Sequence, residues 1–251
     1  MPTDQVHFEI REGLGIITLR NPDSNRMNNA VLAGLQSAIG KVSGGGVRAL
    51  LVRGDGPVFS LGADVKEMLT QPADQLGTVI QHYIDLIGMI EALPIPTIAA
   101  VHGICSSGGL ELALGFDQLW AASGTKIGFL EPLIAALPLA GGVQRIAARA
   151  GHARAFEITS AGILYAAEEF ERWNIVTRVL PADTLQTEAE MFATKMAAGP
   201  THAYGAIKAL LSVWDTGGVA AADKVTVQTI TPVMASDRTK STIAAYLARI
   251  G

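Results

Sequence analysis

Short apolar runs alternate with longer amphipathic stretches along the first two thirds of the chain. Each run is bounded by Gly, Pro, Asn or Asp, the residues that end strands in turns. These runs predict five strands, at residues 14–19, 49–52, 97–101, 118–122 and 175–180. Because strand, short turn and helix repeat in this way, the pattern predicts an α/β core.

One amphipathic stretch shows the helical repeat most clearly, and it is expected to end before Pro94. Its apolar residues recur at steps of three and four, which places them on one helical face. They are Leu76, Val79, Ile80, Tyr83, Ile84, Ile87 and Ile90. After about residue 181 the strand pattern fades, and helical stretches at 188–197 and 203–214 follow, with breaks at 198–200 and 216–218. The chain is therefore divided into a core at residues 1–181 and a C-terminal helical region at residues 182–251.

The composition indicates which class of protein to expect. The chain has 251 residues, of which 49% are hydrophobic and 17% charged, enough for a substantial core. No apolar run reaches the roughly 18 residues of a membrane span, and the N-terminal stretch lacks the pattern of a secretion signal. We therefore expect a cytoplasmic protein without membrane contact. The formal charge of −4 argues against a nucleic-acid partner, because phosphate binding needs clustered cations.

Several common site motifs are absent from the sequence. The single Cys105 excludes an intramolecular disulfide and is expected to be a small buried side chain, and no metal site is expected from Cys or His spacing. The glycines at 44–46 lack a following Gly-Lys-Ser/Thr, and those at 141–142 lack the dinucleotide spacing. Neither Ser106 nor Ser107 has the flanking glycines of a nucleophile elbow. These patterns therefore predict turns and loop residues.

The most informative segment is 102–111, His-Gly-Ile-Cys-Ser-Ser-Gly-Gly-Leu-Glu, which opens an apolar helical pattern after a strand-like run. Glycine lets the main chain approach a ligand, and the first helical turn leaves N–H groups unpaired at the positive end of the helix dipole. The Gly108 N–H is thus suited to an oxyanion, and Glu111, one turn later, to acid/base chemistry. The alternative is a close helix–sheet contact with Glu111 solvated.

A second segment has the same form. A strand-like run at 48–53 and a turn at 54–57 lead through Gly-Ala-Asp at 62–64 into another helix, which offers a second N–H at a helix entry. Together with the run at 94–103, these segments closely resemble the enoyl-CoA hydratase/isomerase family, the crotonase superfamily. The resemblance continues in Pro-Leu-Ala-Gly-Gly-Val-Gln-Arg (138–145), Gly-His-Ala-Arg-Ala-Phe-Glu (151–157) and Trp-Asn-Ile-Val-Thr-Arg-Val-Leu-Pro (173–181), and covers most of the chain.

The resemblance implies a fold and an assembly. The fold is a crotonase-like spiral of repeated strand-turn-helix units with a C-terminal helical region. That region packs on the core and on neighbouring subunits, in a homotrimer or a dimer of trimers.

The resemblance also implies a chemistry. In the enzymes that this chain resembles, two backbone N–H groups hold the thioester oxygen of an acyl-CoA, and the matching residues are Ala63 and Gly108. Fixed donors there favour the charged transition state of water addition over the neutral thioester. Two glutamates match Glu111 and Glu131, and a close carboxyl pair in an apolar pocket can share one proton. The implied activity is hydration of 2-enoyl-CoA, with coenzyme A as part of the substrate and no separate cofactor.

The sequence departs from the family pattern at two places. Leu130 stands before Glu131 where proline is usual, and Pro132 follows, so the direction of the Glu131 carboxylate is left open. Glu131 as a strand-end cap of the following turn is the alternative. Ser107 replaces the first glycine of a triple-glycine run and adds a hydroxyl that binds substrate or water.

The contacts to coenzyme A are also implied by the resemblance. The loop at 21–27 is similar to one that contacts the nucleotide end, and the stretch at 63–66 matches the segment near the adenine. Arg26 and Lys66 can pair with phosphates, or remain solvated cations. The implied substrate-binding residues are Arg26, Met27, Ala63, Asp64, Val65, Lys66 and Gly108.

Other activities remain open at this point. An enoyl-CoA isomerase would use Glu131 alone to shuttle a proton between carbons, and the family also includes decarboxylases and carbon-carbon lyases. A non-catalytic acyl-CoA-binding or RNA-binding homologue is a different class. Loss of both carboxylates would favour the former and a basic surface helix the latter, and the sequence has neither feature.

Overall fold

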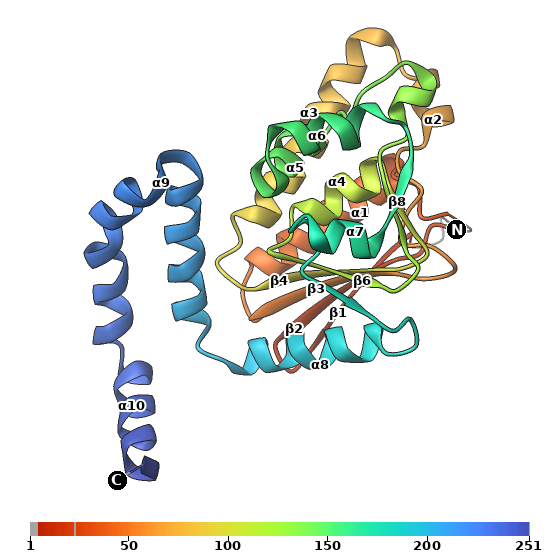
Figure 1. The fold of residues 1–251 in the computed structure, drawn as a ribbon. Helices are drawn as coiled ribbons and strands as arrows, with labels where there is room; N and C mark the ends of the chain where they lie inside the picture. The colour runs from red at the N-terminus through yellow and green to blue at the C-terminus, as the bar shows by residue number, and fades with distance from the viewer. Residues whose placement is uncertain (1–4, 23, 251) are drawn as a thin grey trace.

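A six-stranded sheet forms the centre of the fold in the computed structural model, which describes residues 5–22 and 24–250 (Figure 1). Residue 23 of the predicted nucleotide loop lies outside the described residues. The strand order is β1-β2-β3-β4-β6-β9. Strands β1 and β2 form an antiparallel hairpin, and all later neighbours pair in parallel. The strands are β1 (Val6–Arg11), β2 (Leu14–Leu19), β3 (Ala49–Gly54), β4 (Thr97–Val101), β6 (Gln118–Ala122) and β9 (Arg178–Leu180).

Both faces of this sheet are covered, which explains why its central strands read as continuous apolar runs. Leu50 and Val52 of β3 point to one face and pack with helices α1 (Asn29–Ser43) and α3 (Ala73–Glu91). Ala49 and Leu51 point to the other face, where α8 (Leu185–Ala198) lies along the sheet (Figure 1). The alternation follows from the two-residue period of a strand.

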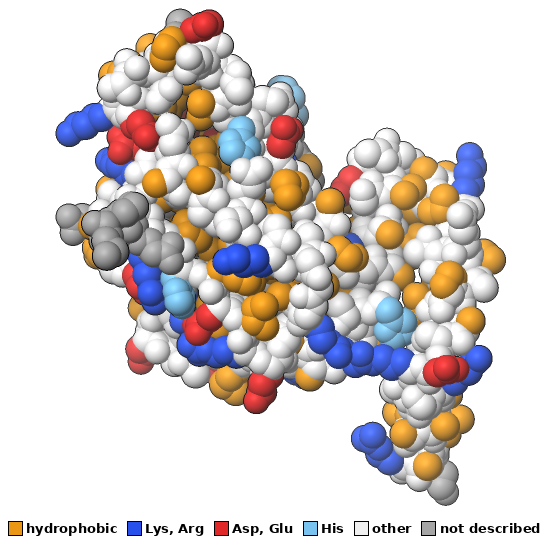
Figure 2. All heavy atoms as spheres, turned by 180° about the vertical axis from the view of Figure 1, so that it is seen from behind, with side chains coloured by type: hydrophobic (Ala, Val, Ile, Leu, Met, Phe, Trp, Pro, Cys, Tyr) orange, Lys and Arg blue, Asp and Glu red, His pale blue; other side chains and the backbone are white. Residues whose placement is uncertain are grey.

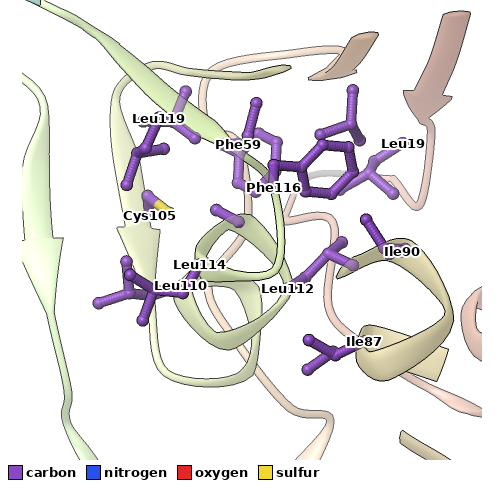
Figure 3. Close-up of a cluster of buried hydrophobic side chains, with 14 of the residues drawn as sticks. Leu19, Phe59, Ile87, Ile90, Cys105, Leu110, Leu112, Leu114, Phe116 and Leu119 are labelled. Atoms are coloured by element: carbon purple, nitrogen blue, oxygen red, sulfur yellow. The ribbon is translucent and has the colours of Figure 1, made fainter. Parts of the chain in front are cut away.

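A smaller sheet carries the segment that the sequence marks as most informative. Its strands β5 (Ile104–Ser106), β7 (Lys126–Gly128) and β8 (Leu164–Ala166) lie in the order β5-β7-β8. Helix α4 (Gly108–Leu114) leaves β5 after one residue, and all seven of its residues are buried. Figure 3 shows this helix among apolar side chains that include Phe116, Ile87 and Ile90. A helix enclosed in this way holds its N-terminal turn rigidly.

The remaining helices surround the smaller sheet or extend from the core. They are α2 (Val65–Thr70), the 3₁₀ helix η1 (Glu131–Ile134), α5 (Gly142–Ala150), α6 (His152–Ser160), α7 (Ala167–Arg172), α9 (Thr201–Ala235) and α10 (Asp237–Ile250). Helix α9 begins against the core, where Lys208 pairs with Asp117 at 2.8 Å. It is interrupted at Gly218, and α9 and α10 then form an arm that extends away from the sheet (Figure 1). No helix of the described residues is both long and apolar enough to cross a membrane.

The α/β core and the C-terminal helical region predicted from the sequence are confirmed. The runs at 14–19, 97–101 and 118–122 match strands residue for residue, and the predicted helix before Pro94 is α3. The run at 175–180 is too long, because the N–H groups of Ile175 and Val176 bond to Phe170 O and strand pairing starts at Arg178. The division at residue 181 stays a prediction.

Candidate active site

Two helix-entry loops lie side by side at the start of α4. The chain turns from β5 into α4 at Ser107, whose φ of 54° and ψ of −130° are unusual for a residue with a side chain. The loop before α2 runs beside this turn, joined to it by a bridge between Ser60 and Cys105. A methyl group placed on Gly108 would lie 3.4 Å from Ala63 N. The Gly108 and Ala63 nitrogens are therefore close neighbours.

Both of these nitrogens keep their protons available. Among the described residues, neither the Gly108 N–H nor the Ala63 N–H has a hydrogen-bond acceptor. The loop is held by Ser60, whose Oγ accepts the Gly62 N–H at 3.1 Å and donates to Asn25 O at 2.7 Å. Two neighbouring N–H groups without a partner, one of them at a helix N-terminus, can stabilise an oxyanion.

Tyr83 of α3 makes a hydrogen bond to Gly108, one of the two residues whose N–H groups are without an acceptor. Its hydroxyl donates to Gly108 O, and burial raises the pKa of the phenol well above its usual range, so the group stays protonated. The sequence placed Tyr83 on the apolar face of a helix but did not indicate this role. The contact joins residues 25 positions apart, which a helical period cannot reveal.

Glu111 lies on the first turns of α4 and is only 2% exposed. Its Oε1 accepts the N–H groups of Ala140, at 2.7 Å, and Gly142, at 2.9 Å. Burial is the main cause that raises the pKa of this carboxyl to about 7. The nearby Glu131 raises it further, whereas the two backbone N–H groups and Arg145 lower it. A solvated helix residue, the alternative considered for Glu111, is thereby ruled out.

The raised pKa of Glu111 predicts a pH-dependent cost to stability. The folded state binds the proton more tightly than the unfolded chain, so stability is highest below the unfolded pKa and is lost as pH rises through the folded value of about 7. Glu111→Gln, neutral at every pH, should therefore be about 3 kcal/mol more stable than the wild type at pH 8 and within about 1 kcal/mol at pH 5.

Denaturant unfolding of both proteins at the two pH values measures this difference. The matched control is Glu188→Gln, which removes an exposed carboxylate from α8. A Glu111→Gln protein that is less stable than the wild type at pH 8 would contradict the desolvation of this carboxyl.

Glu131 begins η1 and lies at the same cavity as Glu111. Its Oε2 accepts the Ser107 hydroxyl at 3.0 Å. Burial raises the pKa of the Glu131 carboxyl, and the hydrogen bond from Ser107 counteracts part of that rise. The direction that Leu130 and Pro132 left open is thus toward Ser107 at the α4 entry and toward the cleft that Glu111 also lines.

A largely apolar cleft of about 890 Å³, its open mouth included, joins these groups. Six of the predicted site residues line it: Met27, Ala63, Val65, Gly108, Glu111 and Glu131. Apolar side chains from α3, from η1 and from the loop after η1 complete its wall, among them Leu76, Val79, Ile80, Ile134 and Leu139. The apolar residues of α3 therefore serve two places: those near its start line the cleft, whereas Leu86, Ile87 and Ile90 near its end pack in the core.

The other predicted substrate contacts lie outside the cleft lining. Arg26 donates to Ala63 O at 3.3 Å, Asp64 caps α2 by accepting the N–H groups of Lys66 and Glu67, and Lys66 is exposed. Met27 and Ala63 pair as an isolated bridge, which keeps the loop at 21–27 beside the oxyanion groups. A role of Arg26, Asp64 and Lys66 in binding coenzyme A stays a prediction.

Comparison with known proteins gives a consistent result. A profile of the enoyl-CoA hydratase/isomerase family matches residues 9–250. A probable enoyl-CoA hydratase of Mycobacterium bovis is 36% identical over 196 residues, 77% of this chain and 76% of that protein. One of Bacillus subtilis is 31% identical over 159 residues, 62% of each chain.

Solved structures agree with the relatives. The crystal structure of an enoyl-CoA hydratase from Bacillus anthracis superposes with a TM-score of 0.93 at 26% identity, covering 98% of this chain and 96% of that one. An enoyl-CoA hydratase structure from Geobacillus kaustophilus gives a TM-score of 0.94 at 23% identity, covering 99% and 96%, which supports the fold alone.

Proposed function

The chain belongs to the enoyl-CoA hydratase/isomerase family, and on this premise we propose that it adds water to 2-enoyl-CoA thioesters to give 3-hydroxyacyl-CoA. One observation carries the proposal. The carboxyl groups of buried Glu111 and half-buried Glu131 line the same cleft as Gly108 and Ala63, whose N–H groups have no acceptor among the described residues and can bind a thioester oxygen. Hydration needs an acid, a base and an oxyanion site, and this cleft has candidates for all three.

The proposed reaction uses each group once. One carboxylate takes a proton from water as the water oxygen bonds to the β-carbon. The electrons of the double bond move toward the thioester oxygen, where the Gly108 and Ala63 N–H groups stabilise the developing negative charge. The other carboxyl group gives its proton to the α-carbon. The sum is one water added, with one proton returned to the carboxyl pair.

The two carboxyl groups are suited to hold one proton between them. Burial raises the pKa of both, and the charge of Glu131 raises that of Glu111 further. The singly protonated pair therefore has both an acid and a base near neutral pH. Each group also has one oxygen anchored, Glu111 by two backbone N–H groups and Glu131 by Ser107, which leaves the other oxygen for the reaction.

The lining of the cleft favours a neutral, apolar acyl group. Among the described residues that line it, none is Lys, Arg or His, and three are glutamates, Glu67, Glu111 and Glu131. A carboxylate at the far end of the acyl chain would be desolvated there without a cation and close to like charges. We propose uncharged 2-enoyl chains as the substrates.

The proposal is tested by assaying the purified protein against 2-enoyl-CoA and 3-enoyl-CoA esters of several chain lengths, each with and without a terminal carboxylate. Loss of the absorbance of the conjugated 2-enoyl thioester marks hydration. A gain of that absorbance from 3-enoyl esters marks isomerisation, the alternative in which Glu131 acts alone. Hydration of the uncharged 2-enoyl esters supports the proposal, and isomerisation without hydration contradicts it.

We also propose that the protein assembles as a homotrimer or a dimer of trimers. None of the described residues of α9 and α10 is buried, yet these two helices carry many large apolar side chains (Figure 2). They include Ile207, Leu211, Trp214, Val227, Ile230, Met234, Ile243, Tyr246 and Leu247. Exposed apolar surface on this scale is typical of a protein interface.

The cytoplasmic location of the protein also stays a prediction.

The assembly is measured by the molar mass of the protein in solution. The wild type should have the mass of three or six chains at micromolar concentration. Tyr246→Glu with Leu247→Glu should lower that mass, because it places charges on the apolar face of the arm, whereas Lys240→Glu on the same helix serves as the charged control. A monomeric wild type would rule out this assembly.

A further inference from the structure

Ser107 has a hydrogen-bonding role that the resemblance does not assign, since glycine is usual at its position. Its Oγ accepts the Leu130 N–H at 3.3 Å and donates to Glu131 Oε2 at 3.0 Å. These contacts tie the α4 entry to Leu130, the N-cap of η1, and to Glu131, its first residue. Leu130 is also the residue that stands where the family usually has proline before the second glutamate, Glu131.

The hydroxyl has one proton, and its surroundings decide where that proton points. Because the Leu130 N–H occupies an acceptor position on Oγ, the best use of the hydroxyl proton is donation to Glu131 Oε2. A proton on Oε2 would reverse this bond and leave the Ser107 proton without a partner. The contact therefore disfavours protonation of Oε2 and leaves Oε1 as the oxygen that exchanges a proton.

The backbone conformation at Ser107 is strained, which indicates that the side chain is retained at a cost in folding stability. Its φ of 54° is in the region that favours glycine, where a residue with a Cβ is strained. Glycine would relieve the strain and would leave the backbone hydrogen bonds of the turn in place, from Ser107 N to Gly128 O and from Glu111 N to Ser107 O. Strain of this kind at a cleft is a signature of function.

We propose that Ser107 is a positioning residue, which binds Glu131 Oε2 and so directs Glu131 to exchange its proton with the substrate through Oε1. The inference rests on the proposed hydration, in which Glu131 is part of the carboxyl pair. Its chemistry is that of proton transfer alone. The proton that leaves Oε1 goes to the substrate carbon, and the negative charge left on the carboxylate is stabilised by the Ser107 hydroxyl.

A nucleophilic role for Ser107 is the competing interpretation. Strand β5, the turn at Ser107 and helix α4 resemble the geometry of a nucleophile elbow, although the flanking glycines are missing. The contacts favour positioning, because the hydroxyl is bound on both sides by Leu130 and Glu131. In the described part of the chain, the cleft is lined by Glu131 and Gly108 but not by Ser107.

The test compares Ser107→Gly and Ser107→Ala with the wild type, because both remove the hydroxyl but only glycine removes the strain. The expected result is a fall of about tenfold to a hundredfold in kcat for both variants, with KM within about threefold of the wild type. Ser107→Gly should melt at the same temperature as the wild type or higher. A protein that is as stable as the wild type but slower separates positioning from folding.

A second comparison is made in the Glu131→Gln background. There, Ser107→Gly should cause little further loss, because the two residues act through one carboxylate. Unchanged kcat in both Ser107 variants, an additive loss in the double variant, or an acyl adduct on Ser107 in mass spectra with a 2-enoyl-CoA would each overturn the proposal. If Glu131→Gln alone keeps the wild-type rate, the two-carboxyl mechanism fails instead.

Discussion

Glu111→Gln and Glu131→Gln should each lower the hydration rate about a thousandfold, because each removes one of the two groups that transfer a proton in the proposed reaction. Glutamine has nearly the shape of glutamate, and in Glu111→Gln the side-chain carbonyl oxygen can still accept the Ala140 and Gly142 N–H groups. The double variant should be little worse than the single ones, since the groups act as a unit. Steady-state rates with one 2-enoyl-CoA substrate measure all three variants.

The same variants distinguish hydration from isomerisation. An isomerase that uses Glu131 alone would lose activity in Glu131→Gln and largely keep it in Glu111→Gln. Glu111→Gln is also expected to be more stable than the wild type at pH 8, so its loss of activity cannot be assigned to unfolding. Glu188→Gln is the exposed control and should keep the full rate. Hydration that is unaffected by Glu111→Gln would rule out the two-glutamate mechanism.

Gly108→Ala should reduce turnover by a factor of about a hundred to a thousand while the fold is kept. The added methyl group would make only ordinary contacts, 3.4 Å from Ala63 N and 3.5 Å from Tyr83 Cε1. In the proposed binding mode it would stand where the thioester oxygen approaches both N–H groups. Gly108→Pro removes the N–H itself and should be at least as damaging. Rates and melting temperatures of both variants are the required measurements.

A matched glycine provides the control for this prediction. Gly40 lies in α1, and a methyl group there would meet no heavy atom within 4 Å. Gly40→Ala should keep full activity and gain a little stability, because alanine is the better helix former. A Gly108→Ala or Gly108→Pro protein that folds and turns over at the wild-type rate would show that the oxyanion assignment is wrong.

The sequence predicts the parts of this fold that depend on local pattern. The strand at 97–101 is a buried run that follows a proline and ends shortly before a glycine, and α3 has an uninterrupted apolar face. Both elements can therefore be predicted from the spacing of apolar residues along the sequence. Strands β1, β5, β7 and β8 were not predicted. The last three have three residues each and are defined by their partners rather than by their own pattern, whereas β1 (Val6–Arg11) alternates apolar and polar residues and was missed. The end of the run at 175–180 was likewise decided by tertiary pairing.

The candidate site divides in the same way. The helix-entry glycines and Glu111 are recognisable because their chemistry is encoded within ten consecutive residues. The anchoring of Glu111 by Ala140 and Gly142, and of Glu131 by Ser107, joins residues 24 to 31 positions apart. Such contacts exist only after the smaller sheet has brought the segments together. The same holds for the division of α3 between cleft and core.

Incubation of the purified protein with an uncharged 2-enoyl-CoA in oxygen-18 water tests the central claim most directly. The account predicts a 3-hydroxyacyl-CoA that carries the heavy oxygen on its β-carbon, formed by the wild type and nearly abolished in Glu111→Gln. The contradictory result is a thioester without heavy oxygen on the acyl chain, whether unchanged or with its double bond moved.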